Sequence, residues 1–166
     1  MRRGLLTTAV VFTALILQAA VVNRLPLPGG RPDLPVVVVV ALALVGGPSY
    51  GAVLGFAVGL GADVLPPADH TLGRLALAYA IVGYLAGLVE DVEERSVLTT
   101  VAVVGIASAV AVILFAGIGA LVGDNRITAA AVTRSLGATV IYDVVLAPFV
   151  VPLVSGAVRR TQLSGP

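Results

Sequence analysis

Several residue types are missing, or nearly missing, from this chain of 166 residues. It has no Cys, no Trp and no Lys, and its single His is His70. Without Cys there are neither disulfides nor thiolate metal ligands, and one His cannot supply a His-rich metal centre. Without Lys, and with aromatic residues at only 5%, the chain has no basic patch and no stacking platform for nucleic acid. We therefore expect no cofactor, no metal site and no nucleic-acid partner.

Charge is also scarce, at 11% of residues, whereas a soluble domain has about a quarter. Hydrophobic residues make up 58% of the chain, and the mean hydropathy is +1.08. Most of this apolar content is Val, Ala, Leu and Gly, a mixture that suits helices packed closely in lipid. The composition predicts an all-α integral membrane protein, and the length predicts one domain over residues 1–166.

Uncharged runs divide the chain into candidate membrane spans of about 20 residues or somewhat fewer. The run over 34–62 is too long for one span and contains Gly46-Gly47-Pro48, a strong helix breaker. We therefore divide it in two. No convincing cleavage site follows the first run, so we interpret it as an uncleaved span rather than a signal peptide. The predicted transmembrane helices are 4–23, 34–46, 49–65, 72–90, 97–122 and 135–156.

Arginine pairs stand at both ends of the chain, Arg2-Arg3 and Arg159-Arg160. Positive residues near span ends stay on the cytoplasmic side, so both pairs predict cytoplasmic termini, which requires an even number of spans. The ten arginines as a whole divide five against five across the membrane in this topology, so the terminal pairs carry the prediction.

A ladder of glycines with a spacing of four runs along the third predicted helix: Gly47, Gly51, Gly55 and Gly59. Such a face lets another helix backbone approach closely. The neighbour is either another helix of this chain, or a partner protein or ligand. Gly83 and Gly87 repeat the spacing in the next helix, which favours packing within the chain.

Three charged residues lie in or beside apolar helices. Asp63 ends the glycine ladder, Arg74 begins the next helix, and Asp143 lies inside the last one. A charge at such depth is costly unless it is paired or functional. We predict that Asp63 and Arg74 form a buried ion pair, and we leave Asp143 as a possible polar site. A proton or ligand site is the alternative.

The only run of charges is Glu90–Arg95, between the fourth and fifth predicted helices. We interpret it as a solvated turn whose acidic residues favour the N-terminus of the helix that follows. The alternative is a docking surface for a cytoplasmic partner.

Four segments, taken in order, resemble the rod shape-determining protein MreD family of bacterial inner-membrane proteins. The first is Arg31-Pro32-Asp33-Leu34, and the second spaces Gly51, Gly55, Phe56, Gly59 and Asp63 along one helix. The third runs from Thr71-Leu72-Gly73 through Tyr79 to Gly83-Tyr84-Leu85, and the fourth contains Pro148, Pro152 and Arg159-Arg160. The resemblance covers essentially the whole chain. The residues that it singles out are Arg31, Pro32, Asp33, Phe56, Gly73, Tyr79 and Gly83.

The resemblance implies a non-enzymatic subunit of the cell-elongation (rod) complex, which organises peptidoglycan synthesis and cell shape. It implies binding to MreC, and through the complex to MreB, RodA and an elongation-class penicillin-binding protein. It also implies a fold similar to the substrate-binding subunits of energy-coupling-factor vitamin transporters. The rival is a small-molecule-binding subunit or transporter with Asp63 and Arg74 in a polar pocket. No nucleophile, base or metal cluster supports an enzyme.

Overall fold

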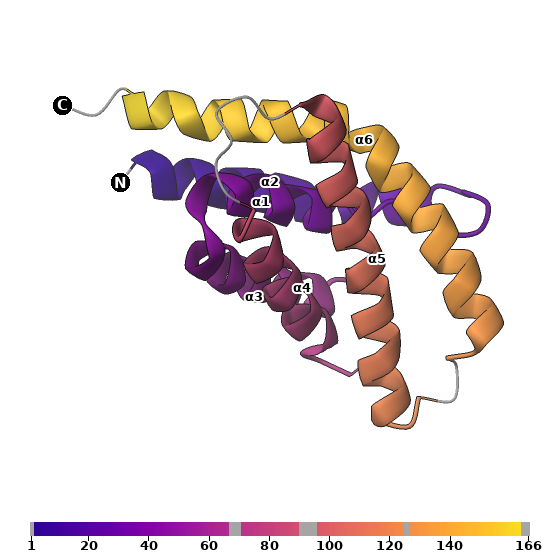
Figure 1. The fold of residues 1–166 in the computed structure, drawn as a ribbon. Coiled ribbons are helices and arrows are strands. Elements are labelled where there is room, and N and C mark those ends of the chain that lie inside the picture. Colours follow the sequence, from indigo (N-terminus) through magenta and orange to yellow (C-terminus); the bar gives the residue numbers. More distant parts are fainter. Residues whose placement is uncertain (1, 67–70, 90–95, 125–126, 164–166) are drawn as a thin grey trace.

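The computed structural model describes residues 2–66, 71–89, 96–124 and 127–163. Every regular element in these ranges is helical, in the order shown in Figure 1. Six α-helices lie in the described ranges, in the order in which helices are predicted. The elements are α1 (Arg2–Ala20), the short 3-10 helix η1 (Val22–Arg24), α2 (Leu34–Gly46), α3 (Pro48–Val64), α4 (Arg74–Gly87), α5 (Val97–Leu121) and α6 (Ala129–Leu163).

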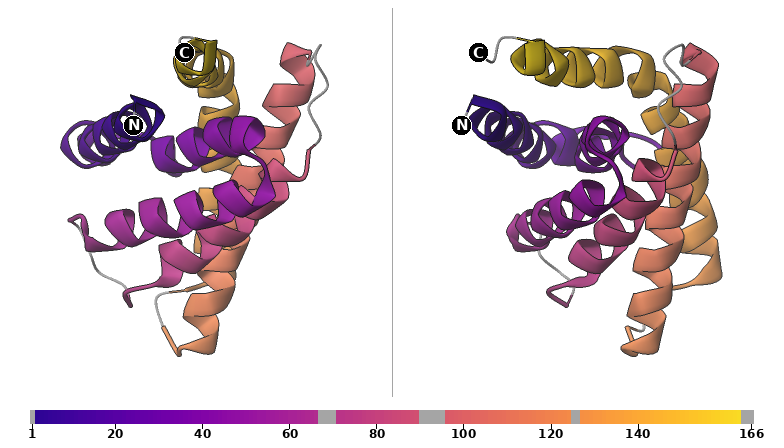
Figure 2. Two further views of the ribbon diagram at one scale, coloured as in Figure 1. Left: turned by 90° about the vertical axis from the view of Figure 1, so that its left-hand side faces the viewer. Right: turned by 60° about the vertical axis from the view of Figure 1, so that its left-hand side comes forward.

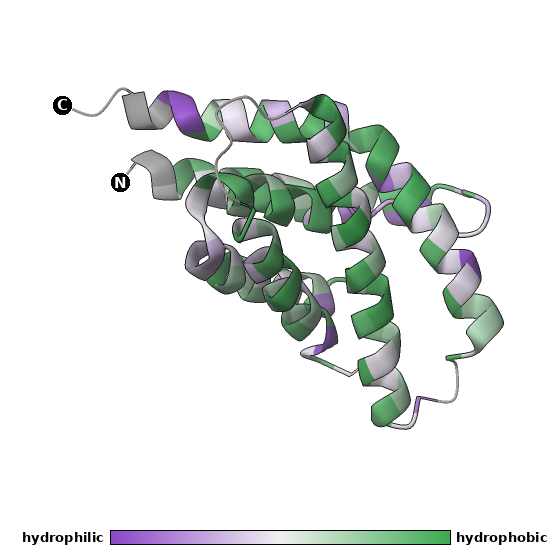
Figure 3. Cartoon of the chain, viewed as in Figure 1, coloured by the Kyte–Doolittle hydropathy of each residue, from purple (hydrophilic) through white to green (hydrophobic). Residues whose placement is uncertain are grey.

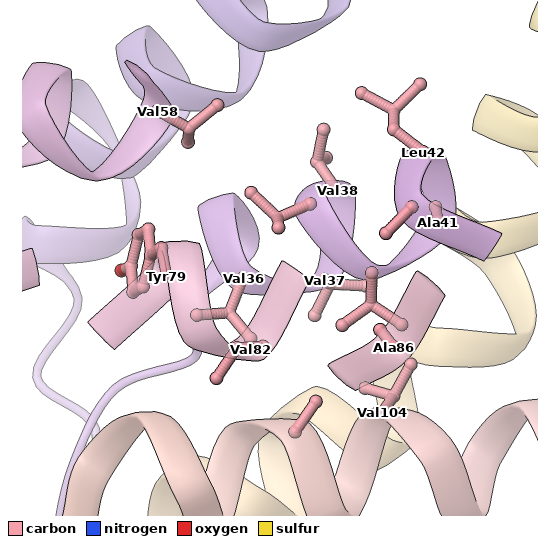
Figure 4. Packing of buried hydrophobic residues seen from close by; sticks show 14 of the residues in the cluster. Val36, Val37, Val38, Ala41, Leu42, Val58, Tyr79, Val82, Ala86 and Val104 are labelled. Carbon is pink, nitrogen blue, oxygen red and sulfur yellow. The ribbon is translucent and has the colours of Figure 1, made fainter. Parts of the chain in front are cut away.

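Helix α2 forms the centre of the fold. It begins where the Asp33 side chain accepts a hydrogen bond from the N–H of Val36, with Pro35 in its first turn, both of which favour a helix start. Every residue from Pro35 to Leu44 is buried. A helix that is apolar on all faces has to be surrounded by others, and Figure 4 shows its valines among side chains from α3, α4 and α5.

The break between α2 and α3 lies where Gly46-Gly47-Pro48 predicts it. Gly47 has φ +82°, a conformation that side chains disfavour, and Pro48 then starts α3. The two halves of the long apolar run are therefore separate helices, as predicted.

Helices α3 and α4 approach each other through their glycines. A Cβ placed on Gly51, Gly55 or Gly59 would overlap backbone carbonyl oxygens of α4, those of Gly83, Tyr79 and Leu75 respectively. Backbone thus lies on backbone along the shared face. Gly87 continues the contact against the Gly47–Pro48 backbone, so the close approach extends to the start of α3.

Helix α6 is longer than the predicted 135–156, because it extends to Ala129 and Leu163. Its extra turns contain Ala, Thr and Arg, which a search for uncharged runs leaves out. Pro148 and Pro152 lie inside the helix. Proline removes a helical hydrogen bond and kinks the chain, and α6 bends in its middle (Figure 1). Its first half follows α5 and its second half lies near α1 (Figures 1 and 2).

The outer surface of the helices is apolar. Among the described residues, three helical segments are long and apolar enough to cross a membrane: Gly4–Arg24, Val97–Leu121 and Ala129–Arg160. Two shorter apolar helices, α2 and α4, accompany them. Large exposed side chains such as Phe12, Val53 and Phe149 point outward, with 60%, 71% and 72% of their surface accessible. This surface is that of a membrane protein, and both termini lie at the same end of it (Figure 2).

Candidate functional site

A polar cluster lies at the end of the bundle opposite the two termini. Figure 3 shows hydrophilic positions gathered where α6 passes the ends of α1 and α2, within helices that are otherwise largely apolar. The connection 25–33 brings polar residues to this end, and α4 and α6 supply others. The cluster joins parts of the chain that are far apart in sequence.

Asp143 is fully buried in α6, and both of its carboxylate oxygens accept hydrogen bonds. The backbone N–H of Asp33 donates to Oδ1 at 2.7 Å, and the Ser108 hydroxyl of α5 donates to Oδ2 at 2.7 Å. A buried carboxylate is tolerated when its oxygens are bonded in this way. Asp143 therefore ties α6 to α5 and to the start of α2.

Asp33 is the second carboxylate of the cluster. Tyr79 of α4 is only 2% exposed, and its hydroxyl lies 2.8 Å from Oδ1 and 2.7 Å from Oδ2. Burial raises the pKa of the Asp33 carboxyl, while the hydrogen bonds from Tyr79 and from the Val36 N–H act in the opposite direction. Asp33 and Tyr79, both singled out by the family resemblance, are thus bonded to each other.

Gln18 of α1 holds the backbone before α2. Its amide nitrogen donates to the carbonyl of Pro32 at 3.0 Å and to the side chain of Asn23 at 3.1 Å, and its oxygen accepts from the N–H of Leu34 at 3.1 Å. On the other side, the Thr139 hydroxyl of α6 donates to the carbonyl of Arg31 at 3.0 Å. The segment Arg31–Leu34 is therefore fixed from both sides.

A cavity of about 340 Å³ opens beside this segment. Ligand pockets have volumes of about 300–1,000 Å³, so the cavity has room for a small group. Its polar lining comes from Gln18, Asn23, Arg31, Asp33, Tyr79, Ser135 and Thr139, and its apolar lining includes Leu65, Leu75, Val112 and Phe115.

Asp63 is 1% exposed, and its carboxylate caps the N-terminus of α4. Its carboxylate accepts from the N–H groups of Gly73, Leu75 and Ala76 at 2.8, 3.1 and 3.2 Å. The first N–H groups of a helix have no partner within it, and they attract negative charge. Gly73 has φ +96° at this turn, which explains why glycine stands there.

Arg74 points the other way, toward α5. Its Nη1 donates to Asp124 at 2.8 Å, its Nη2 donates to the Phe115 carbonyl at 3.0 Å, and its guanidinium lies 4.0 Å from the centre of the Phe115 ring. Gly119 leaves the space that the guanidinium occupies. The arginine is 2% exposed, so this arrangement closes the end of α4 against α5.

The predicted ion pair between Asp63 and Arg74 is wrong. Both residues are buried, but the salt bridge of Arg74 is with Asp124. The physical reason is that backbone N–H groups of α4 occupy the carboxylate of Asp63, while the guanidinium extends away from that helix end. Asp143 does not join them either, because its oxygens accept from Asp33 and Ser108. Neither Asp63 nor Arg74 lines the cavity.

The remaining residues of the resemblance fall at different places. Gly83 lies against Gly51 in the α3–α4 contact, Phe56 is exposed on the outer face of α3, and Arg31 and Pro32 belong to the segment beside the cavity. The acidic run Glu90–Arg95 lies outside the described residues. Within the described residues, no three His, Asp or Glu side chains come together as metal ligands.

Sequence reasoning missed Gln18, Ser108 and Asp124. Gln18 and Ser108 are polar residues inside long apolar helices, a signal that could have marked them for pairing. Asp124 follows Gly123 in a connection and carries no such signal. Its role appears only when the end of α5 lies beside α4.

The family model described as rod shape-determining protein MreD matches residues 2–160. No curated protein and no solved structure matches the chain.

Proposed function

Since the chain belongs to the MreD family of rod shape-determining proteins, we propose that it is a non-enzymatic scaffold subunit of the cell-elongation complex. In this role it binds MreC and helps to organise peptidoglycan synthesis, alongside RodA, an elongation-class penicillin-binding protein and MreB. The family match over residues 2–160 is the observation that carries the proposal.

The distribution of side chains supports a scaffold rather than an enzyme. Among the described residues the buried carboxylates Asp63 and Asp143 are bonded to backbone N–H groups or to Ser108, in contacts that hold helices together. A scaffold needs a packed frame and an outer surface for partners, and these buried contacts and the exposed apolar side chains suit that role.

The surface available to a partner is not the glycine ladder, because α4 occupies that face. The long helix α6 offers a different one. Ile141, Val145, Phe149 and Leu153 follow each other at intervals of four and are 59–75% exposed. An exposed apolar ridge of this kind suits either lipid or a partner helix, so we propose it as the first surface to map for MreC.

We further propose that the protein lies in the bacterial inner membrane with six spans and both termini in the cytoplasm. The terminal arginine pairs support this orientation. The common location of the two termini at one end of the bundle supports an even number of spans (Figure 1). The short apolar helix α2 is packed inside, which suits a span that is shielded from lipid by longer neighbours.

The rival function is a small-molecule-binding or transport subunit of the vitamin-uptake type. The cavity beside Asp33 is the observation that favours it. Its predicted ligands, Asp63 and Arg74, have other partners. The rival would therefore have to rest on a different set of residues.

Depletion of the protein in its host tests the proposal. We expect rod-shaped cells to round up, and we expect MreC to co-purify with the tagged chain in mild detergent.

Gly117→Leu provides a matched control for Gly55→Leu, because a Cβ at Gly117 meets nothing within 4 Å. The Gly117 variant should restore rod shape and the Gly55 variant should not. The scaffold role would be contradicted if depleted cells stayed rod-shaped and if the tagged chain co-purified with no more MreC than an unrelated membrane protein does.

A further inference from the structure

We propose that the cavity beside Asp33 binds the zwitterionic headgroup of an aminophospholipid, with its phosphate at Arg31 and its ammonium at Asp33. This inference concerns a ligand, so it is independent of the scaffold role.

The charges that line the cavity carry the argument. Arg31 and Asp33 both line it and are separated only by Pro32, so the lining contains one positive and one negative residue close together in the chain. A purely anionic ligand would meet the carboxylate, and a purely cationic one would meet the guanidinium. A ligand that carries both charges a short link apart matches both poles.

The positive pole has donors available for a phosphate. The exposed Arg31 side chain supplies a guanidinium, which suits phosphate oxygens better than a point charge does. The hydroxyl of Ser135 also lines the cavity, on the next turn of α6 from Thr139, which holds the Arg31 carbonyl. The anion-binding side therefore consists of one charged and one neutral donor on two elements.

The negative pole has an acceptor available for an ammonium. Both carboxylate oxygens of Asp33 lie within hydrogen-bond distance of the Tyr79 hydroxyl, and Oδ1 also accepts a hydrogen bond from the Val36 N–H. A carboxylate offers about four lone-pair sites, so Oδ2 can accept one more hydrogen bond. An ammonium placed there also favours the ionised form of a carboxyl whose pKa burial raises.

A lipid is the source that fits the position of the cavity. It lies at one end of the bundle, between the last turns of α1 and α3 and the first turns of α2 and α4, and α5 and α6 line it as well. In a membrane-spanning protein, that is the depth of the headgroups. Leu65, Leu75 and Phe115 form an apolar wall beside the poles, as the start of an acyl chain requires.

Native mass spectrometry of the full chain in detergent, with added lipid, tests the proposal. The probes are phosphatidylethanolamine, phosphatidylcholine and phosphatidylglycerol with the same acyl chains. Choline cannot donate a hydrogen bond to Asp33, and glycerol carries no cation. We expect phosphatidylethanolamine to bind about tenfold more tightly than either, the effect of one charge-assisted hydrogen bond.

Substitutions then assign the two poles. Arg31→Gln should weaken phosphatidylethanolamine binding about tenfold, whereas Arg134→Gln, an exposed arginine that does not line the cavity, should not change it. Asp33→Asn keeps a helix-capping side chain but removes the charge, so it should shift the preference toward phosphatidylglycerol. A circular dichroism spectrum equal to that of the unsubstituted protein shows that each variant is folded.

Three outcomes would overturn the proposal. Equal binding of all three lipids would mean that the headgroup is not recognised. Equal effects of the Arg31 and Arg134 substitutions would mean that the binding lies elsewhere. Free phosphoethanolamine that binds as tightly as the lipid would identify a soluble ligand and remove the membrane source.

Discussion

Gly55→Ala is the sharpest test of the packing between α3 and α4. The added Cβ would overlap the carbonyl oxygen of Tyr79 and lie 2.6 Å from the carbonyl carbon of the same residue. Carbon atoms in good contact are about 3.5–4.0 Å apart, so the helices have to separate by about 1 Å at this point. Backbone atoms cannot rotate away as a side chain end can, so the shift propagates along the interface.

The expected free energy follows from two opposing effects. Overpacking of a close-packed site costs about 1–3 kcal/mol, occasionally more. Replacing Gly by Ala inside a helix stabilises the helix by up to about 1 kcal/mol, because Ala has the higher helix propensity. Because the obstacle is backbone, we expect a net loss of about 2 kcal/mol in the free energy of unfolding. For a chain of this size, that corresponds to a Tm lower by about 4–8 °C.

The assay is thermal unfolding in one detergent, followed by circular dichroism and by the fraction that stays monodisperse. Gly117→Ala is the control, since a Cβ there meets nothing within 4 Å and the substitution adds helix propensity alone. The control should unfold at the same temperature as the unsubstituted protein or slightly above it. A Gly55→Ala protein as stable as the control would refute the backbone contact between α3 and α4.

Two further predictions concern the pairing of charges and the topology. A double-mutant cycle between Arg74→Ala and Asp124→Ala, measured as stability in detergent, should give a coupling free energy of about 1–3 kcal/mol, the value of a charge-assisted hydrogen bond. A larger coupling of Arg74 with Asp63 than with Asp124 would contradict the ion pair with Asp124. In intact cells, a thiol reagent that does not cross membranes should label the Asp69→Cys variant and leave the Thr161→Cys variant unlabelled. The native chain has no Cys, so all labelling comes from the introduced residue. The reverse pattern would place the termini outside the cell.

What the sequence by itself determined rests on local rules and composition. The scarcity of charge predicts a membrane protein, and Gly46-Gly47-Pro48 predicts the end of α2 because proline and glycine act on their own backbone. The spacing of the glycines indicates a close helix contact. The ordered motifs indicate the family, which the match over residues 2–160 confirms.

Only the tertiary structure decided which polar groups meet. Asp33 and Asp143 are 110 residues apart, yet the N–H of one bonds to the carboxylate of the other. Arg74 has Asp63 nearby in sequence but pairs with Asp124 of a later connection. Burial requires each polar group to find a partner, but sequence spacing does not say which one, because the partner depends on how the helices cross. The cavity beside Asp33 arises in the same way, because residues of all six α-helices and of the connection before α2 line it, and no local pattern brings them together.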